Sequence, residues 1–145
     1  LQAKGYPLRF HFLRGVSYGE ALAAMAKADM AIGKMKMGYY ANAQIESMLL
    51  GLPTITWVRP DLMTDSLRNS AFIFSSLDDL DKTLEYWLDH PAELASRSAR
   101  TRESILELHN EEVLARRLME YYSIPARNSG ERPSRETSVL TPEAH

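Results

Sequence analysis

The chain has 145 residues, with 17 Lys and Arg against 19 Asp and Glu, which gives a formal net charge of -2. Hydrophobic residues make up 45% and charged residues 25%, a composition typical of a single globular domain. The near-neutral charge disfavours binding to nucleic acid phosphates or to an anionic membrane surface, and we predict no nucleic acid partner. The absence of Cys excludes disulfides, Cys-ligated zinc and thiol nucleophiles.

The sequence indicates neither a metal site nor a membrane-spanning segment. The four His residues are widely scattered and show no metal-ligand spacing. No apolar run approaches the roughly 18 residues that a membrane-spanning helix needs, so we predict no transmembrane segment. Because no charged-then-apolar leader is present, we expect a cytoplasmic protein.

Strand and helix patterns alternate along most of the chain. Short apolar or alternating segments predict four strands, at residues 8–13, 30–32, 54–58 and 71–74. Helical spacing of apolar residues predicts helices that begin at the capping box of Ser17 and Glu20, at Asn42, near Leu80, at Pro91 and after Asn110. Strands that alternate with helices imply a parallel sheet covered on both faces.

We therefore predict an α/β fold with a partial Rossmann-like parallel sheet flanked by helices, followed by a C-terminal helical extension. This domain would cover residues 1–123 and be incomplete at its N-terminus, because so few strands are visible. Residues 124–145 are rich in Pro, Ser, Arg and Glu and hold few apolar side chains. Such a segment cannot bury enough surface to offset its ordering entropy, so we predict a disordered tail.

The segment from strand 30–32 through loop 33–41 to the helix at Asn42 has the layout of a ligand site. In an open α/β sheet, ligands bind where the carboxyl ends of strands meet helix N-termini. The unpaired first-turn amides and the helix dipole predict an anion site there. Lys34 and Lys36 precede this helix, and they either add positive charge or are simply solvated loop lysines.

Glu46 is the second candidate site residue. It follows Asn42 by four residues, so both project from one face of the helix, next to the apolar stripe. A carboxylate one turn from an anion site can accept two hydrogen bonds from a vicinal diol, as acidic residues do with ribose in dinucleotide folds. The alternative is an ordinary surface glutamate.

Residues 38–58 read GYYANAQIESMLLGLPTITWV and resemble the donor-binding segment of family 4 glycosyltransferases and their relatives with the GT-B fold. The central match is Ile45-Glu46-Ser47-Met48 followed by Gly51-Leu52-Pro53, in the family's order and spacing. Weaker matches lie at residues 12–17, 27–29, 89–91 and 109–122. The resemblance spans about residues 8–123 and implies the C-terminal half of a GT-B fold.

The resemblance implies a glycosyltransferase donor domain that binds a UDP-, GDP- or ADP-linked sugar and passes the sugar to an unknown acceptor with retention. It also implies no cofactor besides this donor and no metal bound by the protein. It assigns roles to seven residues. Glu46 would bind the ribose, and Gly15 and Val16 would lie against the base. The diphosphate would be bound by the backbone amides of Tyr39, Tyr40, Ala41 and Asn42.

Three departures from the family pattern affect the expected activity. Gly38 stands where many members have a glutamate, Ala41 replaces a glycine, and the family's Arg/Lys clamp has no counterpart. The acceptor-binding domain is also missing, so we expect the isolated chain to be inactive. Two other functions stay open: a non-enzymatic α/β interaction or oligomerisation module, and a GT-B-fold epimerase. An exposed sheet edge would allow a homo-oligomer.

Overall fold

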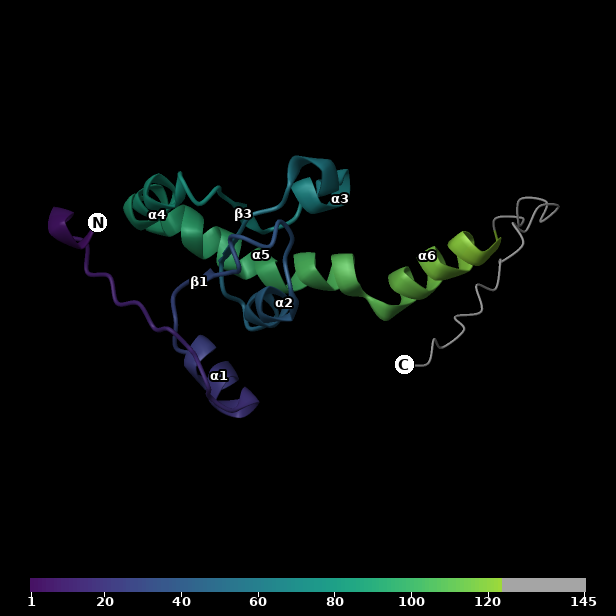
Figure 1. Cartoon of the computed structure of the whole chain (residues 1–145), viewed down its shortest axis with the longest axis horizontal. Helices are drawn as coiled ribbons and strands as arrows, with labels where there is room; N and C mark the ends of the chain where they lie inside the picture. Colours follow the sequence, from purple (N-terminus) through teal and green to yellow (C-terminus); the bar gives the residue numbers. More distant parts are fainter. Residues whose placement is uncertain (124–145) are drawn as a thin grey trace, which may run out of the picture.

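A computed structural model describes residues 1–123 of the chain. Helices and strands alternate through the first two thirds of this region, and three helices complete it (Figure 1). The elements in chain order are η1 (Gln2–Lys4), α1 (Tyr18–Met25), β1 (Ala31–Ile32), α2 (Asn42–Leu49), β2 (Thr54–Thr56), η2 (Pro60–Leu62), α3 (Asp65–Arg68), β3 (Ile73–Phe74), α4 (Leu80–Asp89), α5 (Pro91–His109) and α6 (Glu111–Ser123).

The sheet has three short parallel strands in the order β1-β2-β3. In the register of the strands, Ala31 pairs with Thr54 and Ile55 pairs with Ile73. Each strand reaches the next through a crossover that contains a helix, α2 between β1 and β2 and α3 between β2 and β3. The α/β fold with a parallel sheet flanked by helices is therefore confirmed.

Helices cover both faces of the sheet, and each face has its own apolar cluster. On one face, Ile55 and Ile73 pack with Leu84 and Trp87 of α4. On the other face lies one cluster, to which α2 and α5 contribute Met48 and Ile105, both fully buried. This second face carries α2 and so positions the candidate site.

Helix α2 begins and ends where the sequence predicts. Gly51 adopts φ 86° just after the helix, the left-handed conformation that a glycine C-cap supplies without strain. The chain then enters β2 through Pro53, and the buried hydroxyls of Ser47 and Thr54 lie 3.0 Å apart. These contacts fix α2 against β2.

The predicted strand at residues 8–13 is wrong, because this segment pairs with no strand in the described part of the chain. It is extended but exposed, and the Phe12 side chain is 90% accessible. An alternating pattern produces a strand only when a neighbouring strand accepts its backbone hydrogen bonds. β1 pairs only with β2 among the described residues, and its other edge is not paired with residues 8–13.

The capping box of α1 is confirmed, but its predicted buried face is not. The Ser17 N–H donates to Glu20 Oε2 at 2.8 Å, and the Glu20 N–H donates to Ser17 Oγ at 3.4 Å. No residue of α1 is buried. The local cap therefore sets where this helix begins, while packing contributes little to it.

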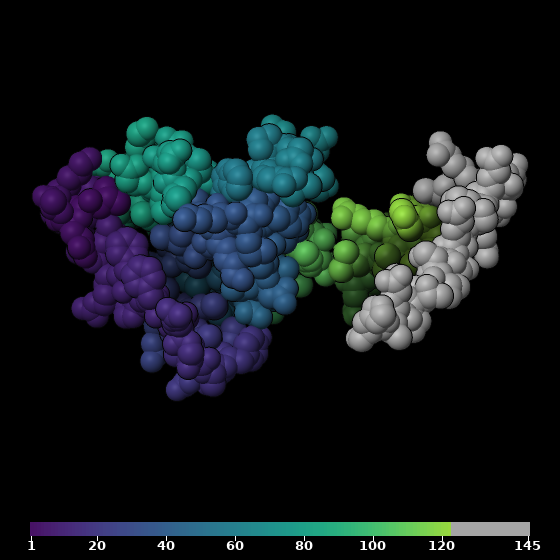
Figure 2. Space-filling view, in the orientation of Figure 1, coloured from purple at the N-terminus to yellow at the C-terminus, as the bar shows by residue number. Residues whose placement is uncertain are grey.

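Helix α6 stands away from the body of the molecule (Figure 2). The side-chain oxygen of Asn110 accepts the Glu112 N–H at 2.8 Å and caps the helix, as the sequence predicts. Tyr121 and Tyr122 are 70% and 78% exposed. The predicted C-terminal helical extension is thus present, and the predicted tail at residues 124–145 lies outside the described residues.

Among residues 1–123, no helix combines the length and apolarity needed to cross a bilayer.

Candidate functional site

The loop between β1 and α2 is held against the segment that follows β2. The Arg59 N–H donates to the Gly38 carbonyl at 2.9 Å. Gly38 has φ 76°, and a Cβ at this position would lie 2.6 Å from Arg59 Cγ and 3.3 Å from Trp57 Cζ3. A side chain at residue 38 would therefore have to displace the Arg59 stem.

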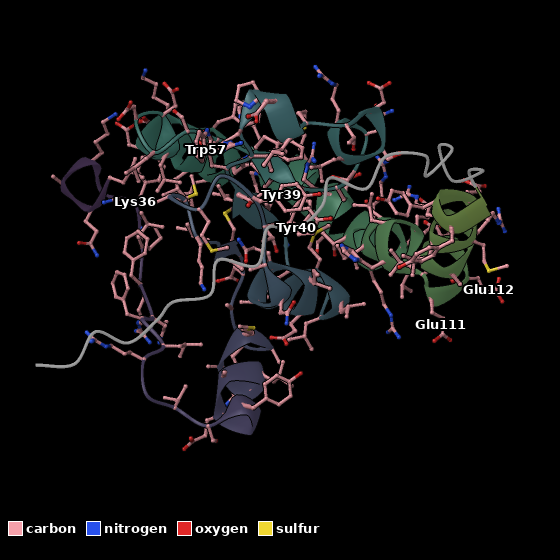
Figure 3. All side chains as sticks on the ribbon, turned by 45° about the vertical axis from the view of Figure 1, so that its right-hand side comes forward. Lys36, Tyr39, Tyr40, Trp57, Glu111 and Glu112 are labelled. Atoms are coloured by element: carbon pink, nitrogen blue, oxygen red, sulfur yellow. The ribbon has the colours of Figure 1, made fainter. Side chains whose placement is uncertain are left out.

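Tyr39 and Tyr40 follow Gly38, and their rings stack with centroids 4.5 Å apart (Figure 3). Tyr40 packs on Phe72 at 4.9 Å, and its hydroxyl lies 2.9 Å from His109 Nε2 at the end of α5. Burial raises the pKa of Tyr40, so this hydroxyl stays protonated at physiological pH. The aromatic contacts anchor the loop to α5 and leave Tyr39 partly accessible.

The first turn of α2 presents fewer free amides than the sequence predicts. Ala41 is extended, with φ -134° and ψ -179°, so its replacement of a glycine causes no backbone strain. Its N–H donates to the Gln44 side-chain oxygen at 3.1 Å and is not available to a diphosphate. The amides of Asn42 and Ala43 have no hydrogen-bond acceptor among the described residues, and they remain available for an anion.

Two buried polar atoms without a hydrogen-bond partner lie near this helix start. They are the Gln44 Nε2 and the Thr56 Oγ1, on residues that are 1% and 0% exposed. The Gln44 amide packs against Gly33, the residue directly after β1, and Thr56 is the last residue of β2. Buried donors and acceptors nearly always have a hydrogen-bond partner, so these two atoms are an exception within the described residues.

Glu46 is half-buried on the second turn of α2, and its carboxylate has no hydrogen bond or ion pair within residues 1–123. The buried face of α2 is formed by Gln44, Ser47 and Met48, while Leu49 is 38% exposed. At about 100° per residue, Glu46 lies roughly 150° around the helix from that face. It is thus farther from the sheet than the apolar stripe predicts, and it is accessible from solvent.

Gly15 and Val16, the predicted base-binding residues, lie in the segment before α1. Both are exposed in the turn before α1, and Gly15 has φ 66° with no atom within 4 Å of a Cβ built on it. No hydrogen bond joins either residue to residues 39–42 within the described chain. Lys34 and Lys36 are exposed and form no ion pair there.

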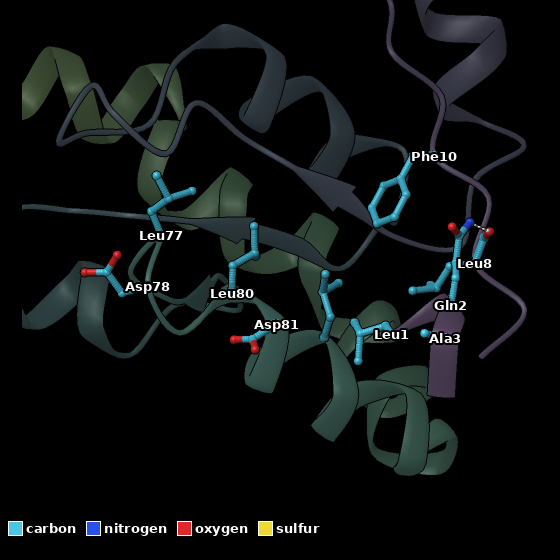
Figure 4. Close-up of a pocket in the computed structure, with 10 residues that line it drawn as sticks. Leu1, Gln2, Ala3, Leu8, Phe10, Leu77, Asp78, Leu80 and Asp81 are labelled. Carbon is cyan, nitrogen blue, oxygen red and sulfur yellow. Dashed lines mark hydrogen bonds between the residues drawn. The ribbon is translucent and has the colours of Figure 1, made fainter. Parts of the chain in front are cut away.

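Two surface hollows stand out, and neither includes Glu46 or the loop. One, of about 560 Å³, opens between the N-terminal segment and α4, where Leu1, Leu8 and Phe10 face Leu80 (Figure 4). The other, of about 710 Å³, lies where α5 meets α6. In the part of the chain that the structure describes, no three His, Asp or Glu residues are grouped as a metal ion would require.

Sequence reasoning missed Gln44 and Arg59. Gln44 occupies the third helical position and accepts the N-cap amide as in a capping box, but the N-cap is Ala41, so the Ser/Thr-x-x-Glu/Gln pattern is incomplete in the sequence. The contact of Arg59 with Gly38 depends on two segments that meet only in the folded chain, and no local pattern signals it.

Comparisons with known proteins add no assignment to this geometry. No protein-family model matches the sequence, no curated protein matches it, and no solved structure matches the fold.

Proposed function

We propose that the chain is the donor-binding part of a GT-B-type glycosyltransferase and that it binds a nucleotide-sugar through the first turns of α2. In this proposal the three described strands belong to a Rossmann-like sheet. The observation that carries it is the unpaired Glu46 carboxylate, which lies one turn after two amides that have no acceptor among the described residues.

The chemistry of a nucleoside diphosphate fits this arrangement. The amides of Asn42 and Ala43, together with the positive end of the helix dipole, would receive phosphate oxygens. The Glu46 carboxylate would accept hydrogen bonds from the two ribose hydroxyls. In sugar transfer the leaving diphosphate gains negative charge, and fixed amides can stabilise that charge without reorganising.

The experiment that tests this function is calorimetric titration of the chain with UDP, GDP and ADP, each compared with its 2′-deoxy form. We expect at least one ribonucleotide to bind, because the site supplies both the carboxylate and the amides. The deoxy form should bind more weakly by about 1 kcal/mol, the value of one lost hydrogen bond.

A variant pair separates Glu46 from a general charge effect. Glu46→Ala should remove the preference for the ribose form, whereas Glu107→Ala, an exposed glutamate on α5, should leave it unchanged. Failure of all three diphosphates to bind would exclude the donor site, and an unchanged ribose preference in Glu46→Ala would exclude the role of Glu46.

A second candidate is a non-enzymatic α/β module that associates through its sheet edge. It is favoured by Gly38, which stands where many family 4 members have a glutamate and where a side chain would have to displace Arg59. It is also favoured by β1, whose Ile32 is 39% exposed and which has no second neighbour in the described chain. Light scattering that finds a stable homo-oligomer, with no response to nucleotides, would support this function instead.

A further inference from the structure

We propose that two copies of this chain bind each other through the hollow between the N-terminal segment and α4. In this dimer the Phe12 side chain of each copy enters the hollow of the other copy. Arg14 of each copy then lies against Asp78 and Asp81 of the other. The inference goes beyond the proposed function, because it involves no nucleotide, and it uses a different surface from the open edge of β1.

The hollow has apolar walls that are open to solvent (Figure 4). Leu8 and Phe10 of the N-terminal segment line one side, and Leu77 and Leu80 line the other. Phe10 and Leu77 are 47% and 51% exposed, and the volume of the hollow is about 560 Å³. Grouped exposed apolar side chains are typical of an interaction site, since covering them removes apolar surface from water. The hollow is therefore suited to an apolar side chain from a partner.

Phe12 is an apolar side chain next to the hollow that nothing within residues 1–123 covers. It is 90% exposed, more than any other large apolar residue in this range. Alternate residues of an extended segment share a face, so Phe12 projects on the same side as Leu8 and Phe10. The ring centroids of Phe10 and Phe12 are 6.3 Å apart. Phe12 thus stands beside the hollow without lining it and leaves an aromatic ring in water.

The N-terminal segment and α4 carry opposite charges. Residues 1–19 contain three Lys and Arg and no Asp or Glu, whereas residues 78–93 contain six Asp and Glu and one Lys. Within one copy the two segments already contact each other, since Lys4 Nζ lies 2.8 Å from Glu85 Oε1. A second N-terminal segment would carry the same attraction for α4.

The charges nearest the hollow are left without partners within residues 1–123. Asp78 and Asp81 line the hollow, are exposed and form no ion pair in this range. Arg14 is also exposed and unpaired there, and it follows Phe12 by two residues on the same face. An aromatic ring followed by a cation is what an apolar hollow with an acidic rim can bind. The charge pattern therefore selects a second copy of the chain as the occupant.

A single two-fold axis can form both contacts at once. In a two-fold dimer the same surface of each copy meets itself, so it must hold both a projecting part and the recess that receives it. Phe12 and the hollow provide these two parts side by side. The dimer would thus bury two phenyl rings and pair two sets of charges.

Sedimentation velocity of the whole chain over a concentration series tests the proposal. We expect an equilibrium between monomer and dimer. Phe12→Ser should weaken dimerisation about tenfold or more, because each of the two contacts loses a buried phenyl ring. Leu118→Ser on α6 and Ile32→Lys on the open edge of β1 are the controls. Both residues are exposed and apolar but lie outside the hollow, so the equilibrium should not change.

Charge reversal tests the pairing of Arg14 with the acidic rim. Arg14→Glu alone, and Asp78→Lys with Asp81→Lys in one chain, should each weaken dimerisation several-fold, because like charges then face each other. A mixture of these two variants should dimerise as the unsubstituted chain does. One contact of the mixed dimer pairs the reversed charges, and the other keeps the original pairs.

Three results would overturn the proposal: a chain that stays monomeric at every concentration, a dimer that Phe12→Ser leaves unchanged, and a mixture that dimerises no better than its separate variants. Loss of the dimer in Ile32→Lys but not in Phe12→Ser would assign the association to the sheet edge, and the same result with Leu118→Ser would assign it to α6. Circular dichroism checks that each variant is folded, and the mixture decides the case if Phe12→Ser does not fold.

Discussion

Replacing Gly38 with Ala is expected to destabilise the chain by about 2–3 kcal/mol. An L-residue at φ 76° costs about 1–2 kcal/mol, because its Cβ approaches the following carbonyl. The new Cβ would also lie 2.6 Å from Arg59 Cγ and 2.8 Å from Cδ. Arg59 is exposed enough to move, and the shifted rotamer adds about 1 kcal/mol.

Gly51→Ala is the matched control for this substitution. Gly51 also has positive φ, at 86°, but no atom lies within 4 Å of a Cβ built on it. Gly51→Ala should lower the free energy of unfolding only by the cost of the left-handed backbone, about 1–2 kcal/mol. Urea denaturation followed by circular dichroism gives the free energy of unfolding of each variant. If Gly38→Ala costs no more than Gly51→Ala, the close approach of Arg59 to the loop is not present in solution.

Three further substitutions test the local structure. Ser17→Ala should cost about 1 kcal/mol and speed amide hydrogen exchange across α1, since the capping box rather than burial holds that helix. Met48→Ala should lower the free energy of unfolding by about 2–4 kcal/mol, because Met48 is 0% exposed in the core between α2 and α5. Burial lowers the pKa of His109 below 6.5, so the unfolded chain binds a proton more readily than the folded chain. Stability should therefore fall as the pH drops through 6.5 and below, and urea denaturation of His109→Gln should lack that part of the loss. Three results would contradict these expectations. They are a pH dependence of stability that is unchanged in His109→Gln, an amide exchange rate that is unchanged in Ser17→Ala, and a loss of unfolding free energy under about 1 kcal/mol in Met48→Ala.

The sequence alone predicted the elements whose signals come from residues close together in the chain. The capping box of Ser17, the glycine that ends α2, the Pro at the start of α5 and the cap at Asn110 all depend on neighbours within a few residues. The strands β1, β2 and β3 were also predicted, from short apolar segments at residues 30–32 and 71–74 and from the β-branched and aromatic residues at 54–58.

Elements that depend on distant contacts were not predictable in this way. Residues 8–13 alternate as a strand does, yet the pattern does not say whether another strand will lie beside them. The buried face of α2 includes Gln44 and Ser47 instead of Leu49, since hydrogen bonds to Ala41 and Thr54 make their burial favourable. Apolarity alone therefore misplaced Glu46 relative to the sheet.

The candidate site was predictable in part for the same reason. The start of α2 and the position of Glu46 one turn later follow from the local pattern. The use of the Ala41 amide by Gln44 and the contact of Arg59 with Gly38 are tertiary features. Gly15 and Val16 were assigned by resemblance alone, and the structure leaves them exposed in the turn before α1.

The most direct test of the donor site is to follow backbone amide resonances of the isotope-labelled chain as UDP, GDP or ADP is added. If the first turn of α2 receives the diphosphate, the amides of Asn42 and Ala43 should show the largest shifts, because a phosphate oxygen becomes their acceptor. Shifts concentrated around the hollow beside Leu8 and Phe10, with Asn42 and Ala43 unmoved, would contradict the account.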